Sequence, residues 1–312
     1  MSALICGSFA YDAIMLYPGH FKNEILPDKV HMLNVSFLVP EMRREFGGCA
    51  GNIAFNLKLL GGEPLPMGTA GTDFITYAAW MDRHGIPRTH VQELRGHYTA
   101  QAYIVTDLDD NQITAFHPGA MNHAHVQNVP KKGIKLGTVS PDGKEGMIQH
   151  AREFADANVP FLFDPGQGMP MFAGDELKAF IEQASYVAVN DYESEVLKHR
   201  TGLTLKQMAE RVDALIVTHG GKGSQIHAGG KVHDIPIAAA AKPVDPTGCG
   251  DAYRAGLLYG IYNGLDWPTA GRVASLLGAI KIECPGTQNH TFTPESFRAR
   301  FKKEFRYEVP FK

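Results

Sequence analysis

The feature that most constrains the fold is a regular alternation of short apolar runs with helix-length segments, which is clearest after residue 144. The sequence predicts buried strands at residues 161–163, 186–189 and 214–218, and helices at residues 146–158, 175–183 and 193–200. Strands separated by single helices form βαβ units, so they run parallel in one sheet with helices on both faces. We therefore expect an α/β fold with a mostly parallel central sheet.

The first part of the chain continues this pattern. Residues 4–8 form an apolar run that predicts a buried first strand, with Asp12 just beyond its carboxyl end. Residues 50–60 carry apolar side chains at helical spacing after the pair Gly47-Gly48, which predicts a helix. Because ligands of parallel sheets bind beyond the carboxyl ends of the strands, we expect the functional residues to gather there.

Two segments differ in character from this core pattern. The first contains the run Val35-Ser36-Phe37-Leu38-Val39, which suits a half-exposed strand. The second contains two strand-like runs around a polar turn and predicts a hairpin. We interpret residues 13–46 and 97–118 as segments of a small β-sheet lid on one domain that spans residues 1–312.

Charge and cysteine content argue against several classes of protein. With 30 Lys and Arg against 33 Asp and Glu, the formal net charge is −3 and no long run of one sign occurs, so we expect no nucleic-acid partner. The four cysteines lack the spacing of a zinc site or a disulfide framework, which fits the reducing cytoplasm. Residues 1–13 lack a basic segment, and nowhere do about 18 apolar residues follow one another, so we expect neither a secretory signal nor a membrane span.

The most informative stretch is Asp245-Pro246-Thr247-Gly248-Cys249-Gly250-Asp251, which opens directly into a segment with helical periodicity. Gly248 and Gly250 let the backbone turn sharply, so several free N–H groups would converge at a helix N-terminus and form an anion site. The backbone of Gly248, Cys249 and Gly250 would hold a phosphoryl group, and phosphoryl transfer depends mostly on such electrostatic positioning. Asp251 would accept the proton of the attacking hydroxyl group. The alternative is an ordinary loop in which Asp251 caps the helix.

This motif, extended through Ala255-Gly256, resembles the C-terminal signature of the ribokinase or PfkB family of carbohydrate kinases. Three further segments resemble family motifs in the expected order: Gly47-Gly48-Cys49-Ala50-Gly51-Asn52, Asn190-Asp191-Tyr192-Glu193 and Thr218-His219-Gly220-Gly221-Lys222-Gly223. The resemblance covers essentially the whole chain. It implies a ribokinase-like fold, ATP as phosphoryl donor and a small β-sheet lid over the substrate.

The resemblance also implies which residues bind the acceptor sugar. Asp12 would accept hydrogen bonds from two vicinal hydroxyl groups of one sugar. Gly48 would permit close backbone approach, and the Asn52 amide would offer a donor and an acceptor. From the residues alone, Asp12 could equally belong to a turn and Asn52 could cap a helix.

A second set of positions matches the family's nucleotide and ion sites. Asn190, Thr218, Gly220 and Gly223 would contact ATP, and Glu193 would act on Mg²⁺ through water. Asp245, Thr247 and residues 283–288 match the region where many members bind a monovalent cation, such as K⁺, through carbonyl groups. A plain helix start and a tight turn are the alternatives for the first group. Arg254, one turn into the helix, would reach phosphate or be solvated.

Within the family, the chain is most similar to the bacterial adenosine kinases that resemble ribokinase. The similar segments are residues 26–27 with 35–39, 47–60, 116–121 and 164–167. This implies that Ser8, Ser36, Phe116 and Gln167 line a nucleoside pocket, in which Phe116 stacks on the base and Gln167 lies near its polar edge. Each of these four side chains could instead be structural.

One departure leaves the substrate open. Where the adenosine kinases carry an aromatic residue near the base, this chain has Ala102, with Tyr103 adjacent. We expect phosphorylation of the 5′-hydroxyl of a purine nucleoside in purine salvage. The alternatives are a broad inosine, guanosine and adenosine kinase, a kinase of ribose or fructose, and a non-catalytic sensor of nucleotide or sugar. The exposed edge of the lid also suggests a homodimer.

Overall fold

The computed structural model describes residues 2–25 and 27–309, and within them nine strands form one large sheet. The strands are β1 (Ser2–Cys6), β4 (Pro64–Ala70), β5 (His90–Glu93), β8 (Ile134–Val139), β9 (Phe161–Phe163), β10 (Tyr186–Asn190), β11 (Ala214–Thr218), β12 (Ser224–Ala228) and β13 (Lys231–Ile235). Their order is β13-β12-β11-β10-β9-β8-β1-β4-β5. All neighbours from β11 to β5 are parallel, whereas β12 and β13 continue the sheet antiparallel. The predicted mostly parallel sheet is confirmed.

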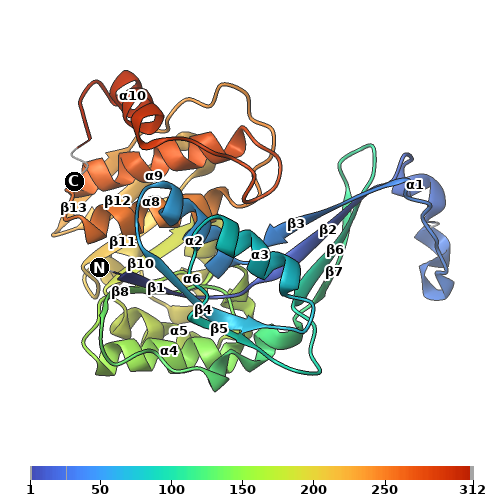
Figure 1. Ribbon diagram of the computed structural model, residues 1–312, viewed down its shortest axis with the longest axis horizontal. Coiled ribbons are helices and arrows are strands. Elements are labelled where there is room, and N and C mark those ends of the chain that lie inside the picture. Colours follow the sequence, from blue (N-terminus) through green and yellow to red (C-terminus); the bar gives the residue numbers. More distant parts are fainter. Residues whose placement is uncertain (1, 26, 310–312) are drawn as a thin grey trace.

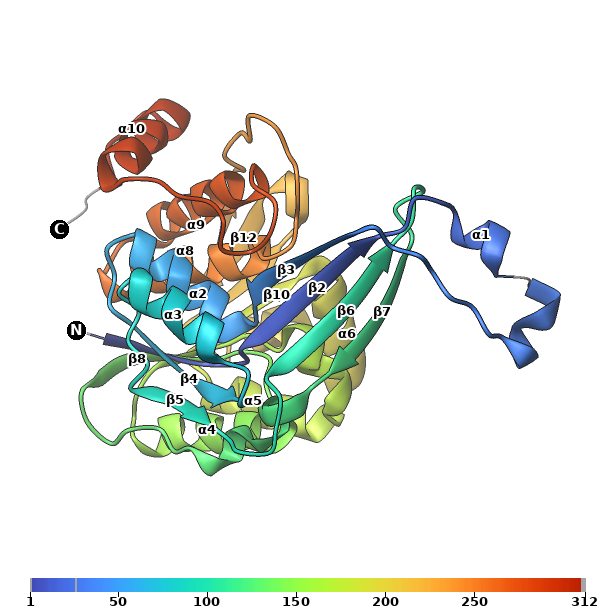
Figure 2. The same ribbon diagram turned by 45° about the vertical axis from the view of Figure 1, so that its right-hand side comes forward.

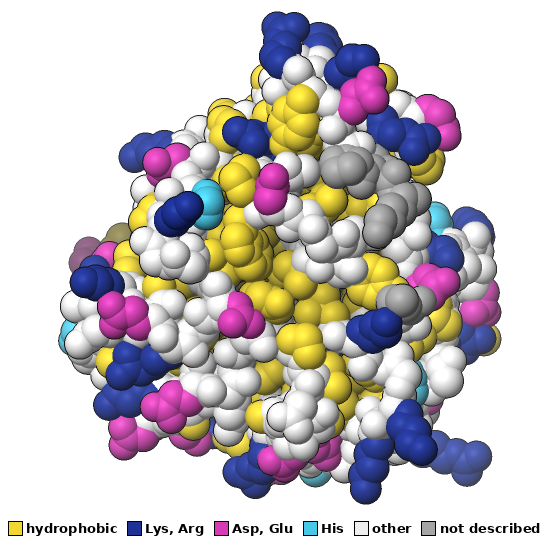
Figure 3. Space-filling view, turned by 90° about the vertical axis from the view of Figure 1, so that its left-hand side faces the viewer, with side chains coloured by type: hydrophobic (Ala, Val, Ile, Leu, Met, Phe, Trp, Pro, Cys, Tyr) yellow, Lys and Arg dark blue, Asp and Glu magenta, His cyan; other side chains and the backbone are white. Residues whose placement is uncertain are grey.

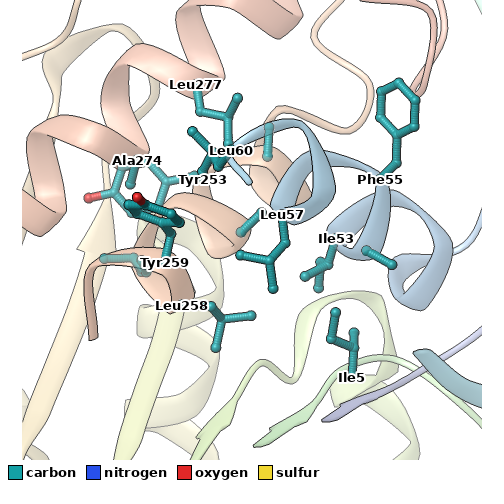
Figure 4. Close-up of a cluster of buried hydrophobic side chains, with 14 of the residues drawn as sticks. Ile5, Ile53, Phe55, Leu57, Leu60, Tyr253, Leu258, Tyr259, Ala274 and Leu277 are labelled. Carbon is teal, nitrogen blue, oxygen red and sulfur yellow. The ribbon is translucent and has the colours of Figure 1, made fainter. Parts of the chain in front are cut away.

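Helices cover both faces of this sheet (Figure 1). One layer contains α2 (Cys49–Leu59), α3 (Ile75–Arg83), α8 (Cys249–Tyr262) and α9 (Trp267–Ile282), with α10 (Pro294–Phe305) packed outside α9. The other contains α4 (Lys144–Asp156), α5 (Gly174–Gln183), α6 (Asp191–Thr201) and α7 (Leu205–Ala209). Successive strand residues point to opposite faces, so Ile5 packs in the first layer and Leu4 in the second. Figure 4 shows the first core, where Ile5 lies below Ile53 and Leu57 of α2.

The local sequence explains where several helices begin and end. At the start of α9, the Asp266 side chain accepts a hydrogen bond from Thr269 N–H (2.7 Å), and a proline lies in the first turn. Thr293 caps α10 in the same way, and its N1 residue is Pro294. Helix α6 ends at Gly202, whose φ of +70° favours glycine. No helix within the described ranges is both long and apolar enough to cross a bilayer.

A second, smaller sheet projects from the carboxyl ends of the large-sheet strands (Figure 2). Its strands are β2 (Ala10–Leu16), β3 (Glu41–Gly47), β6 (Ala100–Thr106) and β7 (Gln112–His117), in the order β3-β2-β6-β7. β2 and β6 are parallel, and the other two pairs are antiparallel. The predicted hairpin is therefore confirmed as β6 and β7. Between β2 and β3 the chain forms an arm beyond the sheet, which contains α1 (Phe21–Glu24) and η1 (Pro27–Met32).

One strand prediction is wrong. Residues 33–39 have no regular structure, and the strand lies farther on, at Glu41–Gly47. The reason is register: β2 ends at Leu16, which pairs with Glu41, so the residues before Glu41 have no neighbouring strand to pair with. Phe37 packs instead against Tyr17 and Phe21, with ring centroids 5.0 Å from each. Leu26, which belongs to the segment quoted for the family resemblance, lies outside the described residues.

The end of the molecule opposite the small sheet carries the N-terminus (Figure 1). On this face, basic and acidic side chains are interspersed around an apolar centre (Figure 3). The parallel strands run away from it, so their carboxyl ends open beneath the small sheet, where most of the predicted site residues are found.

Candidate active site

The anion-binding turn lies at the N-terminus of α8. Gly248 is the N-cap residue with φ +78°, and a Cβ there would lie 3.1 to 3.4 Å from Thr287. Both the positive φ and the close contact explain why glycine occupies this position. Cys249 N–H donates to Pro246 O (3.1 Å), and Ala252 N–H donates to Gly248 O (3.0 Å). The first turn of a helix leaves N–H groups without intrahelical acceptors, and this turn presents them to an incoming anion.

Asp251 lies in this first turn, and its carboxylate is partly buried. Its Oδ2 accepts a hydrogen bond from Asn52 Nδ2 (2.8 Å), and the Cys49 thiol also donates to the carboxylate. The pKa of Asp251 is raised to about 6, mainly by burial and also by nearby Asp164, against the opposing effects of the hydrogen bond from Asn52 and the charge of Arg254. The group is therefore ionised at neutral pH yet basic enough to accept a proton, as a general base requires.

A chain of hydrogen bonds fixes the orientation of the Asn52 amide. Trp80 Nε1–H donates to Gln288 Oε1 (2.9 Å), Gln288 Nε2 donates to Asn52 Oδ1 (2.9 Å), and Asn52 Nδ2 then faces Asp251. An indole nitrogen is only a donor, so each amide in the chain has one allowed orientation. Gln288 Nε2 also donates to the Tyr77 hydroxyl (2.7 Å). A Cβ at Gly51 would overlap that hydroxyl, so the network requires glycine there.

Arg254 is buried, with only 5% of its surface exposed. Its Nη2 lies 3.0 Å from Asp164 Oδ1 and 3.9 Å from Glu193 Oε2, and it donates to Ala188 O (3.3 Å). The solvated alternative is therefore wrong, because this arginine is buried and faces two carboxylates beside Asp251. Its contact with phosphate stays a prediction. Burial, with Asp164 second, raises the pKa of Glu193, and Arg254 lowers it.

The four predicted ATP positions lie at or just beyond the carboxyl ends of two neighbouring strands of the large sheet. Asn190 and Thr218 end β10 and β11 and pair directly with each other. Thr218 is followed by η4 (Gly220–Lys222) and by Gly223, with φ of +53° at Gly220 and +95° at Gly223. Asn190 Oδ1 accepts from Glu193 N–H (2.7 Å) and Glu193 Oε2 accepts from Asn190 N–H (2.8 Å), which is a capping box. The pair therefore forms a capped helix start with Glu193 beside Asp164 and Arg254, and its contacts with ATP and Mg²⁺ stay predictions.

Asp12 and Phe116 share one face of the small sheet. Asp12 pairs with Ala102 on β6, and Ala102 pairs with Phe116 on β7. Paired residues point the same way, and strands are spaced by about 4.8 Å, so Asp12 and Phe116 are about 10 Å apart across Ala102. Tyr103 alternates to the opposite face, so the only side chain between Asp12 and Phe116 on this face is the methyl group of Ala102, which is buried. On the same face as Asp12, Arg43 Nη2 lies 4.0 Å from Asp245 Oδ2, so this face is turned toward the anion-binding motif.

The carboxylate of Asp12 is held among other acids at the base of the small sheet. Its Oδ2 would lie 2.7 Å from a Cβ at Gly47, and the next residue, Gly48, has φ +86°. Burial raises the pKa of Asp12 to about 6, with Glu45 and then Asp245 adding to the shift. Asn52 thus contacts Asp251, and Asp12 lies against Gly47, next to Gly48 at the N-terminus of the same helix α2.

The remaining pocket positions are more dispersed. Ser8 is buried, and its Oγ accepts from Cys49 N–H (3.2 Å), so it caps α2. Ser36 is exposed in the irregular segment of the arm. Gln167 is exposed in η3 (Gly166–Met171), where it lines a cavity of about 580 Å³ together with Glu193 and Tyr192. Phe116 is 51% exposed.

The residues matched to a monovalent-cation site lie together. Asp245 Oδ1 accepts from Thr247 N–H (2.9 Å), and Asp245 Oδ2 accepts from Gly286 N–H (2.8 Å). The backbone carbonyls of Asp245 and Cys284 both accept from Lys281 Nζ, at 2.7 and 3.2 Å. Two carbonyl groups of the predicted region, those of Asp245 and Cys284, therefore face one ammonium group.

Sequence reasoning missed three participants: Trp80, Asp164 as partner of Arg254, and Lys281. Asp164 directly follows the apolar run of β9, a position typical of functional carboxylates in parallel sheets. Lys281 is the single charged residue in the largely apolar run of residues 273–282, which is a signal for a buried lysine. Trp80 gave no such signal.

Comparison with known proteins shows which kinases this chain is similar to. The model of the pfkB family carbohydrate kinases matches residues 5–294. A nucleoside kinase of Methanocaldococcus jannaschii is 32% identical over 272 residues, which cover 86% of this chain and 90% of that protein. The structure of a Burkholderia thailandensis nucleoside kinase in complex with inosine is 52% identical and has a TM-score of 0.89, covering 98% of this chain and 99% of that one. The same protein in complex with ADP-inosine gives a TM-score of 0.87 at 52% identity, covering 99% of both chains.

Proposed function

The chain belongs to the pfkB family of carbohydrate kinases, and from this membership we propose that it transfers the γ-phosphoryl group of ATP to the 5′-hydroxyl group of a purine nucleoside. The proposal rests on two features that occur together. One is Asp251 in an anion-binding helix start, and the other is the line of paired residues Asp12, Ala102 and Phe116 across the small sheet, which places Asp12 and Phe116 about 10 Å apart. That spacing suits a ligand with a sugar hydroxyl pair at one end and a flat base at the other. The kinases of Burkholderia thailandensis and Methanocaldococcus jannaschii, named for nucleosides, support this choice.

The chemistry follows from the geometry around Asp251. The ribose would be held by Asp12, so that its primary hydroxyl group lies between Asp251 and the N-terminus of α8. Asp251 would take the hydroxyl proton, and the N–H groups of the first turn would hold the phosphoryl oxygens in line with the attack. Closure of the small sheet would exclude water that otherwise hydrolyses ATP.

The charge distribution near Glu193 fits Mg²⁺ as the companion of ATP. Glu193 and Asp164 provide two carboxylates balanced by one guanidinium, Arg254, so this edge carries an excess of negative charge. Mg²⁺ usually keeps several waters and needs few carboxylates, and Glu193 would hold it through water. When bound there, Mg²⁺ would neutralise phosphate charge during transfer.

The pH dependence of the rate should report Asp251. Because the base must be ionised, kcat is expected to fall about tenfold per pH unit below the pKa of about 6 and to stay level above it. The profile of kcat/KM should fall more steeply, since Asp12 also has a pKa of about 6 and loses an acceptor on protonation. Initial rates between pH 4.5 and 8.5 test this, and a flat kcat profile down to pH 5 would contradict the role of Asp251.

The small side chain of Ala102 should set selectivity among purines. The larger side chain of Ala102→Phe is expected to lower kcat/KM for guanosine about tenfold or more relative to adenosine, because guanosine carries a further exocyclic group. The matched control is Tyr103→Phe, which changes the next residue of β6 on the opposite face and should leave the ratio unchanged. If Ala102→Phe leaves the ratio unchanged too, the base does not lie over this line of paired residues. The small residue at this position favours a broad inosine, guanosine and adenosine kinase as the second candidate.

The small sheet and arm are also the proposed dimer interface. Exposed apolar side chains gather there: Leu16, Met32, Leu33, Leu38, Met42 and Ile113. We expect light scattering to give about twice the chain mass of 34.1 kDa, and Met42→Asp on edge strand β3 to lower it to one chain mass. A wild-type protein of single-chain mass at micromolar concentration would refute the dimer.

The four free cysteines support the cytoplasm as the proposed compartment.

A further inference from the structure

Lys281 is a fully buried lysine in the last turn of α9. Its Nζ donates to Asp245 O (2.7 Å) and to Cys284 O (3.2 Å). Both acceptors are backbone carbonyls, and they belong to two loops: one leads into the anion-binding turn and the other follows α9. An ammonium group held by carbonyl oxygens in a buried position resembles the way proteins bind a desolvated monovalent cation.

The surroundings offset part of the cost of burying this ammonium. The pKa of Lys281 is lowered from its usual value, mainly by burial, while Cys249, Asp245 and Cys284 act in the opposite direction and Arg43 of β3 adds to the lowering. The Asp245 carboxylate accepts hydrogen bonds from Thr247 N–H and Gly286 N–H. These bonds hold its negative charge beside the carbonyl groups of Asp245 and Cys284, which we call the carbonyl cage. Two carbonyl oxygens and one nearby carboxylate thus surround the ammonium group of Lys281.

Both carbonyl groups of the cage lie close in sequence to residues of the proposed active site. Asp245 lies three residues before Gly248, the N-cap of α8, and Cys284 lies four residues before Gln288, which orients Asn52 toward Asp251. The ammonium thus ties the phosphate-binding turn to the loop that supports the base. A K⁺ ion would need the same carbonyl oxygens, so the residues present do not fit a separate K⁺ ion there.

We propose that Lys281 acts as a built-in cation: its ammonium group takes the place of a monovalent ion between the Asp245 and Cys284 carbonyls, and the kinase therefore works without K⁺. The inference rests on the proposed kinase function for its activity readout. Its binding readout, below, does not depend on that function.

The test compares the wild type with Lys281→Met in buffers whose only monovalent cation is tetramethylammonium, with and without 100 mM KCl. For the wild type, KCl should change the rate of ADP release with Mg²⁺-ATP and inosine by less than about twofold, and it should not change the melting temperature. For Lys281→Met, the rate without K⁺ should fall at least about tenfold. KCl should restore part of it and raise the melting temperature, because the ion then enters the vacated cage. Lys242→Met, an exposed lysine nearby, serves as the matched control.

Two results would overturn the inference. One is strong activation of the wild type by K⁺. The other is a Lys281→Met protein whose melting temperature and rate do not respond to K⁺. If Lys281→Met does not fold, Lys281→Gln, which keeps a donor for one carbonyl, is judged by the same criteria. A wild type that is inactive with every nucleoside in every salt would instead contradict the proposed function, and the melting temperatures would still decide whether Lys281 occupies a cation site.

Discussion

Replacing Asp251 by Asn is expected to lower kcat by about 10²- to 10⁴-fold, the range that a positioned general base contributes. The introduced amide would have no basic oxygen to take the hydroxyl proton, although its carbonyl oxygen could still accept the hydrogen bond from Asn52. The fold and the anion-binding turn should therefore persist. Steady-state rates with a nucleoside, and calorimetric titration with ATP, measure the two parts separately.

The expected signature is a large loss of kcat with ATP affinity within about threefold of the wild type. Cys249→Ala, at the start of the same helix turn, is the control, since only the backbone of this residue is assigned a role. A Cys249→Ala protein with normal kcat would show that the turn tolerates substitution. Near-normal kcat in Asp251→Asn would remove the assigned base.

Replacing Arg254 by Met is expected to lower the free energy of unfolding by about 3 to 5 kcal/mol. The guanidinium is buried with Asp164 and Glu193, and its removal leaves two neighbouring carboxylates without a countercharge. Arg254 also lowers the pKa of Asp251, so the acid limb of the kcat profile should move to higher pH in the variant. Urea denaturation and the pH profile measure both effects.

The control for this prediction is Arg88→Met, which removes an exposed ion pair with Asp82. Surface pairs contribute about 0 to 1 kcal/mol, so this variant should unfold almost as the wild type does. An Arg254→Met protein that loses less than about 1 kcal/mol, with an unshifted pH profile, would mean that Arg254 does not neutralise these carboxylates.

Local sequence patterns predict the parallel sheet but do not predict every one of its strands. β10 and β11 were predictable because each is an apolar run directly followed by a turn or a capped helix. β8 was missed although it pairs with β1 near the sheet centre: its six residues include Lys135 and Gly137, which weaken the apolar signal. Gly137 is explained only by packing, because a Cβ there would overlap the Phe154 ring. The start of β3 could not be predicted either, because it depends on the register with β2, in which Leu16 pairs with Glu41.

The candidate site likewise has a part that could be predicted from the sequence and a part that could not. Asp251 and its glycines could be predicted because one contiguous turn contains both the anion site and the base. The supports of that base could not, because they join residues far apart in the chain: Arg254 with Asp164, and Gln288 with Asn52. Lys281 belongs to the same class, since only the folded structure shows that its ammonium reaches the carbonyl of Asp245.

The central claim is that the acceptor is a purine nucleoside. The most direct test is the initial rate of ADP release from Mg²⁺-ATP with inosine, adenosine, guanosine, cytidine, ribose and fructose as acceptors, with ³¹P NMR of the product. We predict that the purine nucleosides are the best acceptors and give 5′-monophosphates, while ribose and fructose are poor. A protein that phosphorylates ribose or fructose faster than any nucleoside would contradict the account of the small sheet, and one that phosphorylates none of the six would contradict the kinase assignment itself.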